Sequence, residues 1–331
     1  MPEATIRCLP TRRFWDQDME YLRAHVTPEI GFVLPEDYTT PALVEAASRG
    51  VDILLGDVPA PEVLEASKGV RLLQVPWTGM DQVDFDVLRR HGFPVCNSHG
   101  NAASVAELGM ALLLSCMKQL PSHHHALRQG NWRRPGAEDC VMPDMLSGKD
   151  VGLIGYGAIG RKLAGMLSGF GATLHPLASE ARQEGGLAVL GADRLDHLCG
   201  RCDVLIVSAP LTPETRGMIG KRQFELMKSS LYLVNISRGA IIDEETLYHA
   251  LEARGIAGAG IDVWYRYPRR GESAARPSRF PFETLDNVVM SPHRGGMARG
   301  ELPHLVDAVE NMNRLAAGKP LINRINMSKR Y

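Results

Sequence analysis

The chain has 331 residues, more than a single hydrophobic core usually organises, so we expect two domains with a ligand cleft between them. Its 37 Lys and Arg residues nearly balance its 38 Asp and Glu residues, which excludes a strong overall field for nucleic acid or an anionic membrane. A small molecule is therefore the expected partner. The first residues, from Met1 to Arg7, lack the basic start and apolar stretch of a secretory signal, so the expected location is cytoplasmic.

The first hundred residues alternate short apolar runs with helical patterns, which is typical of a parallel sheet covered by crossover helices. Helices are predicted for residues 41–49 and 83–90. The predicted strands are centred on Ile6, Phe32, Ile53, Leu72 and Val95. This part is predicted to be one small α/β domain.

A long helical stretch is predicted from Ala102 to about Gly130. Its most apolar run, residues 110–117, is far shorter than the ~20 residues that a membrane helix needs, so it indicates a buried helix. The run His123-His124-His125 is not expected to bind a metal, because consecutive helical side chains point about 100° apart. No metal site is predicted.

The second half repeats the α/β pattern. Its predicted strands are residues 151–154, 173–177, 204–208, 231–236, 258–263 and 288–290. Cys199 and Cys202 precede one of these strands and are interpreted as packing positions. Residues 265–280 are predicted to be an irregular loop, and Glu301 to Leu315 a helix that packs back on the first domain.

A six-residue glycine pattern, Gly155-Tyr156-Gly157-Ala158-Ile159-Gly160, joins the strand 151–154 to a predicted helix over 159–170. This context predicts a dinucleotide site. The first glycine permits the tight turn, the second lets the backbone approach the pyrophosphate, and the third allows close packing of helix on strand. The fold class is therefore α/β, with two doubly wound, Rossmann-like or flavodoxin-like parallel-sheet domains. Residues 101–299 are predicted to form the dinucleotide domain, and residues 1–100 with 300–331 the substrate domain.

The sequence leaves the choice between NAD and NADP open. A site that prefers NAD usually has an acidic residue at the end of its second strand, and Ala178 stands there in this chain. Ser179 and Arg182 are suited to a 2′-phosphate, whereas Glu180 offers an alternative acid. These residues slightly favour NADP.

Five motifs then resemble the D-2-hydroxyacid dehydrogenases in order and separation. They are residues 151–160, 208–217, 235–239, 260–263 and 291–293, and Thr78-Gly79, Asn97 and Ser104 to Glu107 extend the likeness into the first domain. The resemblance covers nearly the whole chain. It also implies a homodimer formed through the nucleotide domain.

The resemblance implies that Arg238 binds the substrate carboxylate and polarises the carbonyl, and that His293 carries the proton. Asp262 would orient the carboxamide or a neighbouring cofactor group. Thr78 and Gly79 would hold the substrate from the other domain, with Trp77 as a pocket wall or a core residue. Further cofactor contacts are expected from Ser104, Ala209, Pro210, Thr215, Ile236, Ser237, His293 and Gly295.

One position departs from the family. Members usually have a glutamate that pairs with the histidine, and Tyr267 stands in its place. A phenol does not stabilise imidazolium as a carboxylate does, so His293 is expected to lose its proton at a lower pH than in such relatives. Formate dehydrogenases, which resemble the same family, have a neutral amide there, so hydride transfer remains compatible with Tyr267.

Positive charge gathers near the same site, where Arg294 follows His293 and Arg266, Arg269 and Arg270 lie in the nearby loop. These arginines fit a substrate with a second anionic group, such as a dicarboxylate or phosphonopyruvate; alternatively they are solvated or meet another subunit. The predicted function is an NAD(P)-dependent oxidoreductase that interconverts a 2-oxo acid and a 2-hydroxy acid. The alternative is a dinucleotide-sensing regulator of the corepressor type, with little or no turnover.

Overall fold

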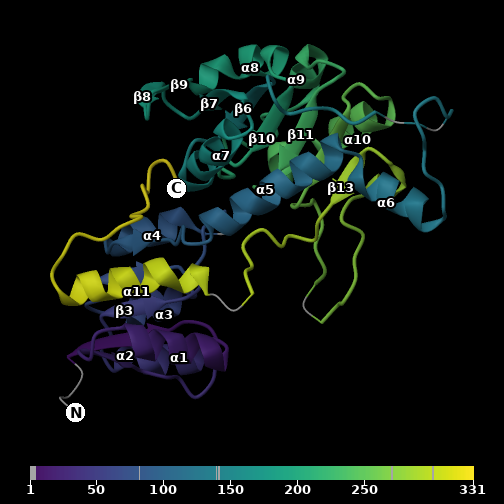
Figure 1. Cartoon of the computed structure of the whole chain (residues 1–331). Helices are drawn as coiled ribbons and strands as arrows, with labels where there is room; N and C mark the ends of the chain where they lie inside the picture. Colours follow the sequence, from purple (N-terminus) through teal and green to yellow (C-terminus); the bar gives the residue numbers. More distant parts are fainter. Residues whose placement is uncertain (1–4, 82, 139, 141, 270, 300–301) are drawn as a thin grey trace. The chain divides into compact units, whose positions relative to one another are not determined.

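The computed structural model describes residues 5–81, 83–138, 140, 142–269, 271–299 and 302–331. The chain divides into two compact units (Figure 1). Unit 1 comprises Met1–Asn101 with Ala298–Tyr331, and unit 2 comprises Ala102–Met297. Arg270 and Glu301, which entered the sequence predictions, lie outside the described residues.

Unit 1 contains a five-stranded parallel sheet in the order β2-β1-β3-β4-β5. The strands are β1 (Ile6–Pro10), β2 (Ile30–Phe32), β3 (Ile53–Leu55), β4 (Leu72–Gln74) and β5 (Val95–Cys96). Alternate residues of β3 enter different cores, because successive strand side chains point to opposite faces. Leu54 packs in one core, and Ile53 and Leu55 pack in the other.

Helices cover both faces of this sheet. They are α1 (Asp16–His25), α2 (Thr40–Ser48), α3 (Pro61–Ala66), α4 (Phe85–His91) and α11 (Pro303–Ala316). Leu43, Leu64 and Leu88 bring α2, α3 and α4 to the Leu54 face, whereas α1 and α11 pack on the other. The helix α11 buries Leu305 and Met312 there.

Unit 2 contains a six-stranded parallel sheet in the order β13-β12-β11-β10-β6-β7. The strands are β6 (Asp150–Ile154), β7 (Thr173–Leu177), β10 (Val204–Val207), β11 (Tyr232–Asn235), β12 (Gly258–Ile261) and β13 (Val288–Met290). The central strand β10 is buried throughout and serves two cores: Val204 and Ile206 in one, Leu205 and Val207 in the other. The fold class predicted from the sequence is confirmed.

The helices of unit 2 are α5 (Ala102–Met117), α6 (Leu120–Arg128), α7 (Ala158–Ser168), α8 (Leu195–Arg201), α9 (Lys221–Leu226) and α10 (Glu244–Glu252). Helices α5 and α7 pack on one face, and α8, α9 and α10 on the other (Figure 1). Cys199 and Cys202 are buried free thiols in this core, and burial raises the pKa of each to about 12. They are packing residues, as the sequence indicated.

Two local features differ from the sequence prediction. The single long helix predicted from Ala102 is two helices, because Gln119 is left-handed (φ 52°) and Pro121 at the start of α6 cannot continue the α5 hydrogen bonds. The polar segment after β7 forms a hairpin of β8 (Arg182–Glu184) and β9 (Leu187–Val189).

Within the described residues no single helix is long and apolar enough to cross a membrane. The helices α5 and α6 reach the required length and apolar composition only together, as a pair bent by 61°.

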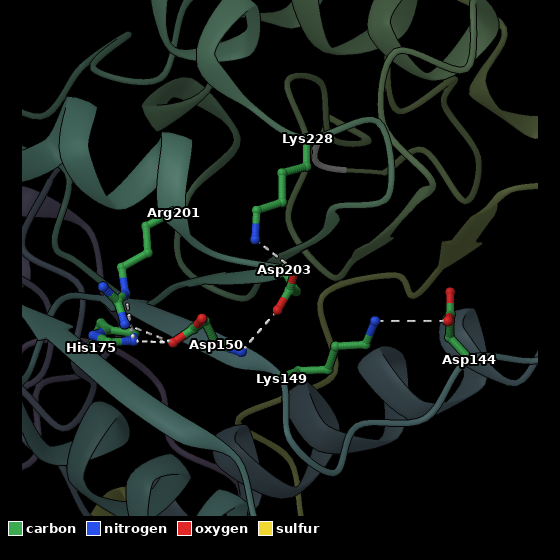
Figure 2. Close-up of polar contacts among 7 residues, drawn as sticks. All are labelled: Asp144, Lys149, Asp150, His175, Arg201, Asp203 and Lys228. Carbon is green, nitrogen blue, oxygen red and sulfur yellow. Dashed lines mark hydrogen bonds and ion pairs between the residues drawn. The ribbon is translucent and has the colours of Figure 1, made fainter.

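The amino ends of β6 and β10 carry a network of charged groups (Figure 2). Asp150 Oδ1 lies 2.6 Å from His175 Nε2 and 3.4 Å from Arg201 Nη2. The backbone N–H of Asp150 donates to Asp203 Oδ2 at 2.9 Å, and Lys228 Nζ donates to Asp203 Oδ1 at 2.8 Å. This network ties neighbouring strands together at the edge opposite the glycine turn.

Candidate dinucleotide and active site

The predicted site residues of unit 2 follow neighbouring parallel strands, and each begins within three residues of a strand end. The glycine turn follows β6, Ala209 follows β10, Arg238 follows β11, Asp262 follows β12 and His293 follows β13. The carboxyl ends of parallel strands share one edge of a sheet. The strand order reverses between β6 and β10, and ligands bind at such a reversal in open α/β sheets.

The three glycines of the turn differ in what requires them. Gly155 has a left-handed backbone (φ +97°), and a side chain there would overlap the backbone of Ala209. A side chain at Gly160 would overlap the carbonyl of Gly155. Gly157 has an ordinary φ of −95°, and a Cβ there would meet nothing within 4 Å. Neither strain nor packing explains Gly157, but the space beside the N-terminus of α7 fits a pyrophosphate.

The loops after β10 and β11 are joined next to this turn. The hydroxyl of Ser237 donates to the carbonyl of Ala209, the residue packed against Gly155. The hydroxyl of Thr215 donates to the carbonyl of Pro210 at 2.7 Å. Ala209 and Ser237 are thus brought to the turn from separate loops.

A cluster of charged side chains lies next to the turn. Arg182 Nη2 donates to the carbonyl of Tyr156 at 3.1 Å, and the guanidinium of Arg161 lies 5.8 Å from the centre of the Tyr156 ring. Arg161 and Arg182 both donate to Glu184. Arg182 was expected here, whereas Arg161 and Glu184 were not.

Asp262 anchors the loop that carries His293. Its buried carboxylate accepts from the Ser291 hydroxyl at 2.5 Å, from the Arg294 N–H at 2.8 Å and from the Gly295 N–H at 3.0 Å. His293 lies between these donors and has a left-handed φ of 59°. The position of His293 therefore depends on Asp262.

Tyr267 lies beside His293, with ring centres 5.6 Å apart and ring planes at 51°. The phenol oxygen accepts the backbone N–H of Trp264 at 3.0 Å, and the indole of Trp264 donates to the carbonyl of Ser291 at 2.8 Å. Trp264, which the sequence did not single out, thus contacts both Tyr267 and the histidine loop.

Arg238 is half-buried at the end of β11. Its Nη1 donates to the carbonyl of Ser237 at 2.8 Å. The side-chain amide of Asn235 donates to the backbone carbonyl of Arg238 at 3.0 Å. The following Gly239 packs so closely on the carbonyl of Trp264 that a Cβ there would lie 2.6 Å from that oxygen. The backbone around Arg238 is therefore held on both sides.

A hollow of about 470 Å³ borders Tyr267 in the irregular loop. It is lined by Arg266, Tyr267, Arg269, Glu272, Ala275 and Arg276.

Arg294 is exposed, and its Nη1 lies 3.6 Å from the sulfur of Met297. The backbone carbonyl of Met297 accepts a hydrogen bond from the hydroxyl of Ser104 at 3.1 Å. Among the described residues no group of three or more His, Cys, Asp and Glu is arranged to hold a metal ion.

In unit 1, Trp77, Thr78 and Gly79 follow β4 at the carboxyl edge of that sheet. The hydroxyl of Thr78 donates to the carbonyl of Ser98 at 2.8 Å. The guanidinium of Arg12, at the end of β1, lies 5.0 Å from the centre of the Trp77 ring. Arg12 is a cation at this edge that the sequence reasoning did not identify.

An open parallel sheet with a strand reversal, a glycine turn at that reversal and an uncrowded Gly157 define a dinucleotide-binding α/β protein. Residues 110–295 match the family described as D-isomer specific 2-hydroxyacid dehydrogenase, NAD binding domain. The chain belongs to this family.

Two curated relatives and one solved structure illustrate the likeness. D-3-phosphoglycerate dehydrogenase of Archaeoglobus fulgidus is 32% identical over 80% of this chain and 49% of its own length, so the chain spans about half of that relative. Glyoxylate reductase of Thermococcus kodakarensis is 31% identical over 90% of this chain and 89% of its own length. The NAD-complexed D-isomer specific 2-hydroxyacid dehydrogenase of Lactobacillus delbrueckii ssp. bulgaricus has the same fold, with a TM-score of 0.79, 22% identity and coverage of 97% of this chain and 100% of that one.

Proposed function

We propose that the chain is a nicotinamide-dependent dehydrogenase that interconverts a 2-oxo acid and a 2-hydroxy acid. The observation that carries this proposal is the shared carboxyl edge of unit 2, where Arg238 and His293 follow the strands β11 and β13 of the sheet that bears the glycine turn. A bound nicotinamide supplies or accepts the hydride at C2 of the substrate. Family membership supports the same reaction.

Arg238 would bind the substrate carboxylate, since a planar guanidinium matches a carboxylate with two parallel hydrogen bonds. Its backbone is fixed by the Asn235 amide and by the packing of Gly239 on Trp264, so the guanidinium starts from a defined position. A bound carboxylate would replace the Ser237 carbonyl as the acceptor of the Arg238 hydrogen bond.

His293 would donate a proton to the carbonyl oxygen during reduction and remove the hydroxyl proton during oxidation. Asp262 would hold the histidine loop, because its carboxylate accepts three hydrogen bonds from residues 291–295. Tyr267 would pack beside the imidazole without adding a charge. The roles of Asp262 in orienting the carboxamide and of Trp77, Thr78 and Gly79 in holding substrate stay predictions.

The substrate is proposed to carry a second anionic group. Support comes from Arg294 next to His293 and from three arginines, Arg266, Arg269 and Arg276, that line the hollow beside Tyr267. Steady-state kinetics with oxaloacetate and phosphonopyruvate against pyruvate checks this. A clear preference for the dianions is expected, and equal kcat/KM for all three acids would contradict it.

The reaction itself is tested by screening 2-oxo acids with NADH and NADPH and following the absorbance of the reduced nicotinamide. The variant His293→Asn is expected to lower kcat by about 10²–10⁴-fold, the usual contribution of general acid catalysis. His197→Asn, exposed on α8, is the matched control and should leave kcat unchanged. Equal losses in both variants, or no turnover of any acid by the unaltered chain, would count against the proposal.

The regulatory alternative is not favoured, because the curated relatives are named dehydrogenases and reductases. A homodimer built through the nucleotide unit and a cytoplasmic location stay predictions.

A further inference from the structure

Glu184 is bound by two arginines from different elements. Its Oε1 accepts from Arg161 Nε, and its Oε2 accepts from Arg182 Nε at 2.7 Å. Arg161 belongs to α7 and directly follows Gly160, whereas Arg182 begins β8. One carboxylate thus occupies two guanidinium groups beside the dinucleotide turn.

The hairpin β8–β9 fixes where this carboxylate lies. Glu184 pairs with Leu187 across the Gly185-Gly186 turn, in which both glycines have positive φ (58° and 80°). Only four residues separate the hairpin from β7, the second strand of the nucleotide fold. The end of that strand is where such folds recognise the adenosine ribose. Arg182 Nη2 connects the cluster to the neighbouring glycine turn by donating to the Tyr156 carbonyl.

Two guanidinium groups around one anion form the kind of arrangement that also receives a phosphate. In this chain the anion belongs to the protein. The hydrogen bonds from Arg161 and Arg182 hold the pKa of Glu184 down to about 2, so the carboxylate is ionised throughout the neutral range. A 2′-phosphate would have to displace a carboxylate from both arginines and then remain beside it as a like charge.

We propose that Glu184 disfavours the 2′-phosphate of NADP and makes this chain select NADH. Glu184 then supplies the acidic group that Ala178 lacks at the end of β7, and it reaches the site from the hairpin. This inference rests on the proposed function, since it assumes that the turn binds a dinucleotide. It reverses the slight preference for NADP drawn from Ser179 and Arg182, because Arg182 is already engaged by Glu184.

The test is calorimetric titration of the full chain with NADH and with NADPH, which measures binding independently of turnover. The unaltered chain is expected to bind NADH more tightly. Glu184→Gln is expected to tighten NADPH binding by about tenfold, the size of effect that removing one nearby like charge has in partly solvated surroundings, and to change NADH binding much less.

Glu225→Gln is the matched control, because it removes an exposed carboxylate of α9, and it should leave both affinities unchanged. Adding Arg182→Ala to Glu184→Gln should remove the gain for NADPH. Tighter NADPH binding by the unaltered chain, weaker NADPH binding by Glu184→Gln, or the same gain from Glu225→Gln would each overturn the inference. If neither dinucleotide binds any of these proteins, the proposed function fails together with the inference; if both bind without the expected shifts, only the inference fails.

Discussion

At the scale of single residues, the neighbour of the histidine is a phenol, where the family resemblance led us to expect a carboxylate. The oxygen of Tyr267 accepts the Trp264 N–H, and its ring lies 5.6 Å from the His293 ring. The ring of Tyr267 therefore lies beside that of His293, and its hydroxyl oxygen accepts a backbone N–H. A carboxylate in the same place would stabilise the imidazolium form, which gives a direct test of the substitution.

In Tyr267→Glu, the activity for 2-oxo acid reduction should persist to a higher pH. Reduction needs protonated His293, so activity is lost as pH rises through the histidine pKa, and a carboxylate beside the ring raises that pKa. The measurement is the pH dependence of kcat/KM. Tyr267→Gln controls for loss of the phenol and should not shift the midpoint upward; an equal upward shift in both variants would contradict the charge argument.

At the scale of an element, the glycine turn separates a folding requirement from a binding requirement. Gly155 has a left-handed backbone and lies against Ala209, so the fold itself requires glycine. Gly157 has neither feature, and its requirement is assigned to the dinucleotide.

Alanine variants of the two glycines should therefore behave differently. Gly155→Ala is expected to lower the free energy of unfolding by about 2 kcal/mol or more, through left-handed strain and overlap with Ala209. Gly157→Ala should cost no more than about 1 kcal/mol as a poorer N-cap, yet weaken dinucleotide binding strongly. Chemical denaturation and calorimetric titration measure the two effects. Unchanged dinucleotide binding in Gly157→Ala would show that the dinucleotide does not require glycine at this position.

At the scale of the whole molecule, the two ends of the strands in the unit 2 sheet have different roles. Site residues follow the carboxyl ends of the strands, and the network of Asp150, His175, Arg201, Asp203 and Lys228 joins neighbouring strands near the amino ends (Figure 2). The hydrogen bond with His175, helped by Arg201, holds the pKa of Asp150 below its usual value. Stability of the fold is thereby linked to pH at a distance from the site.

Because the folded pKa of Asp150 is depressed, its contribution is present above the unfolded pKa and is lost as pH falls through the folded pKa. Asp150→Asn should lower the free energy of unfolding by about 1 kcal/mol at neutral pH, the typical value of one such hydrogen bond. The difference from the unaltered chain should disappear in acid. Urea denaturation across that pH range checks it, and a difference that persists unchanged in acid would show that the carboxylate charge is not responsible.

The sequence by itself predicted the strands of both sheets, because buried strands such as Val204–Val207 are short apolar runs that need no distant partner to be recognised. It also predicted the glycine turn and, through the family resemblance, Arg238 and His293. The break at Gln119 was missed because the apolar pattern continues across it, although Pro121 was a local signal. The hairpin β8–β9 was missed because its first strand, Arg182–Glu184, is polar. The Gly185-Gly186 pair was the strongest sequence signal for a hairpin turn there.

What only the tertiary structure decided is which side chains meet. Asp262 accepts hydrogen bonds from residues about 30 positions away, and Glu184 binds an arginine of α7 23 positions before it. Such pairs leave no periodic pattern in the sequence, because they arise where strand ends and a hairpin converge at one edge of a sheet. The sequence therefore determined that a dinucleotide turn exists and which residues follow the strands, and the folded chain determined that an acid already occupies the arginines beside that turn.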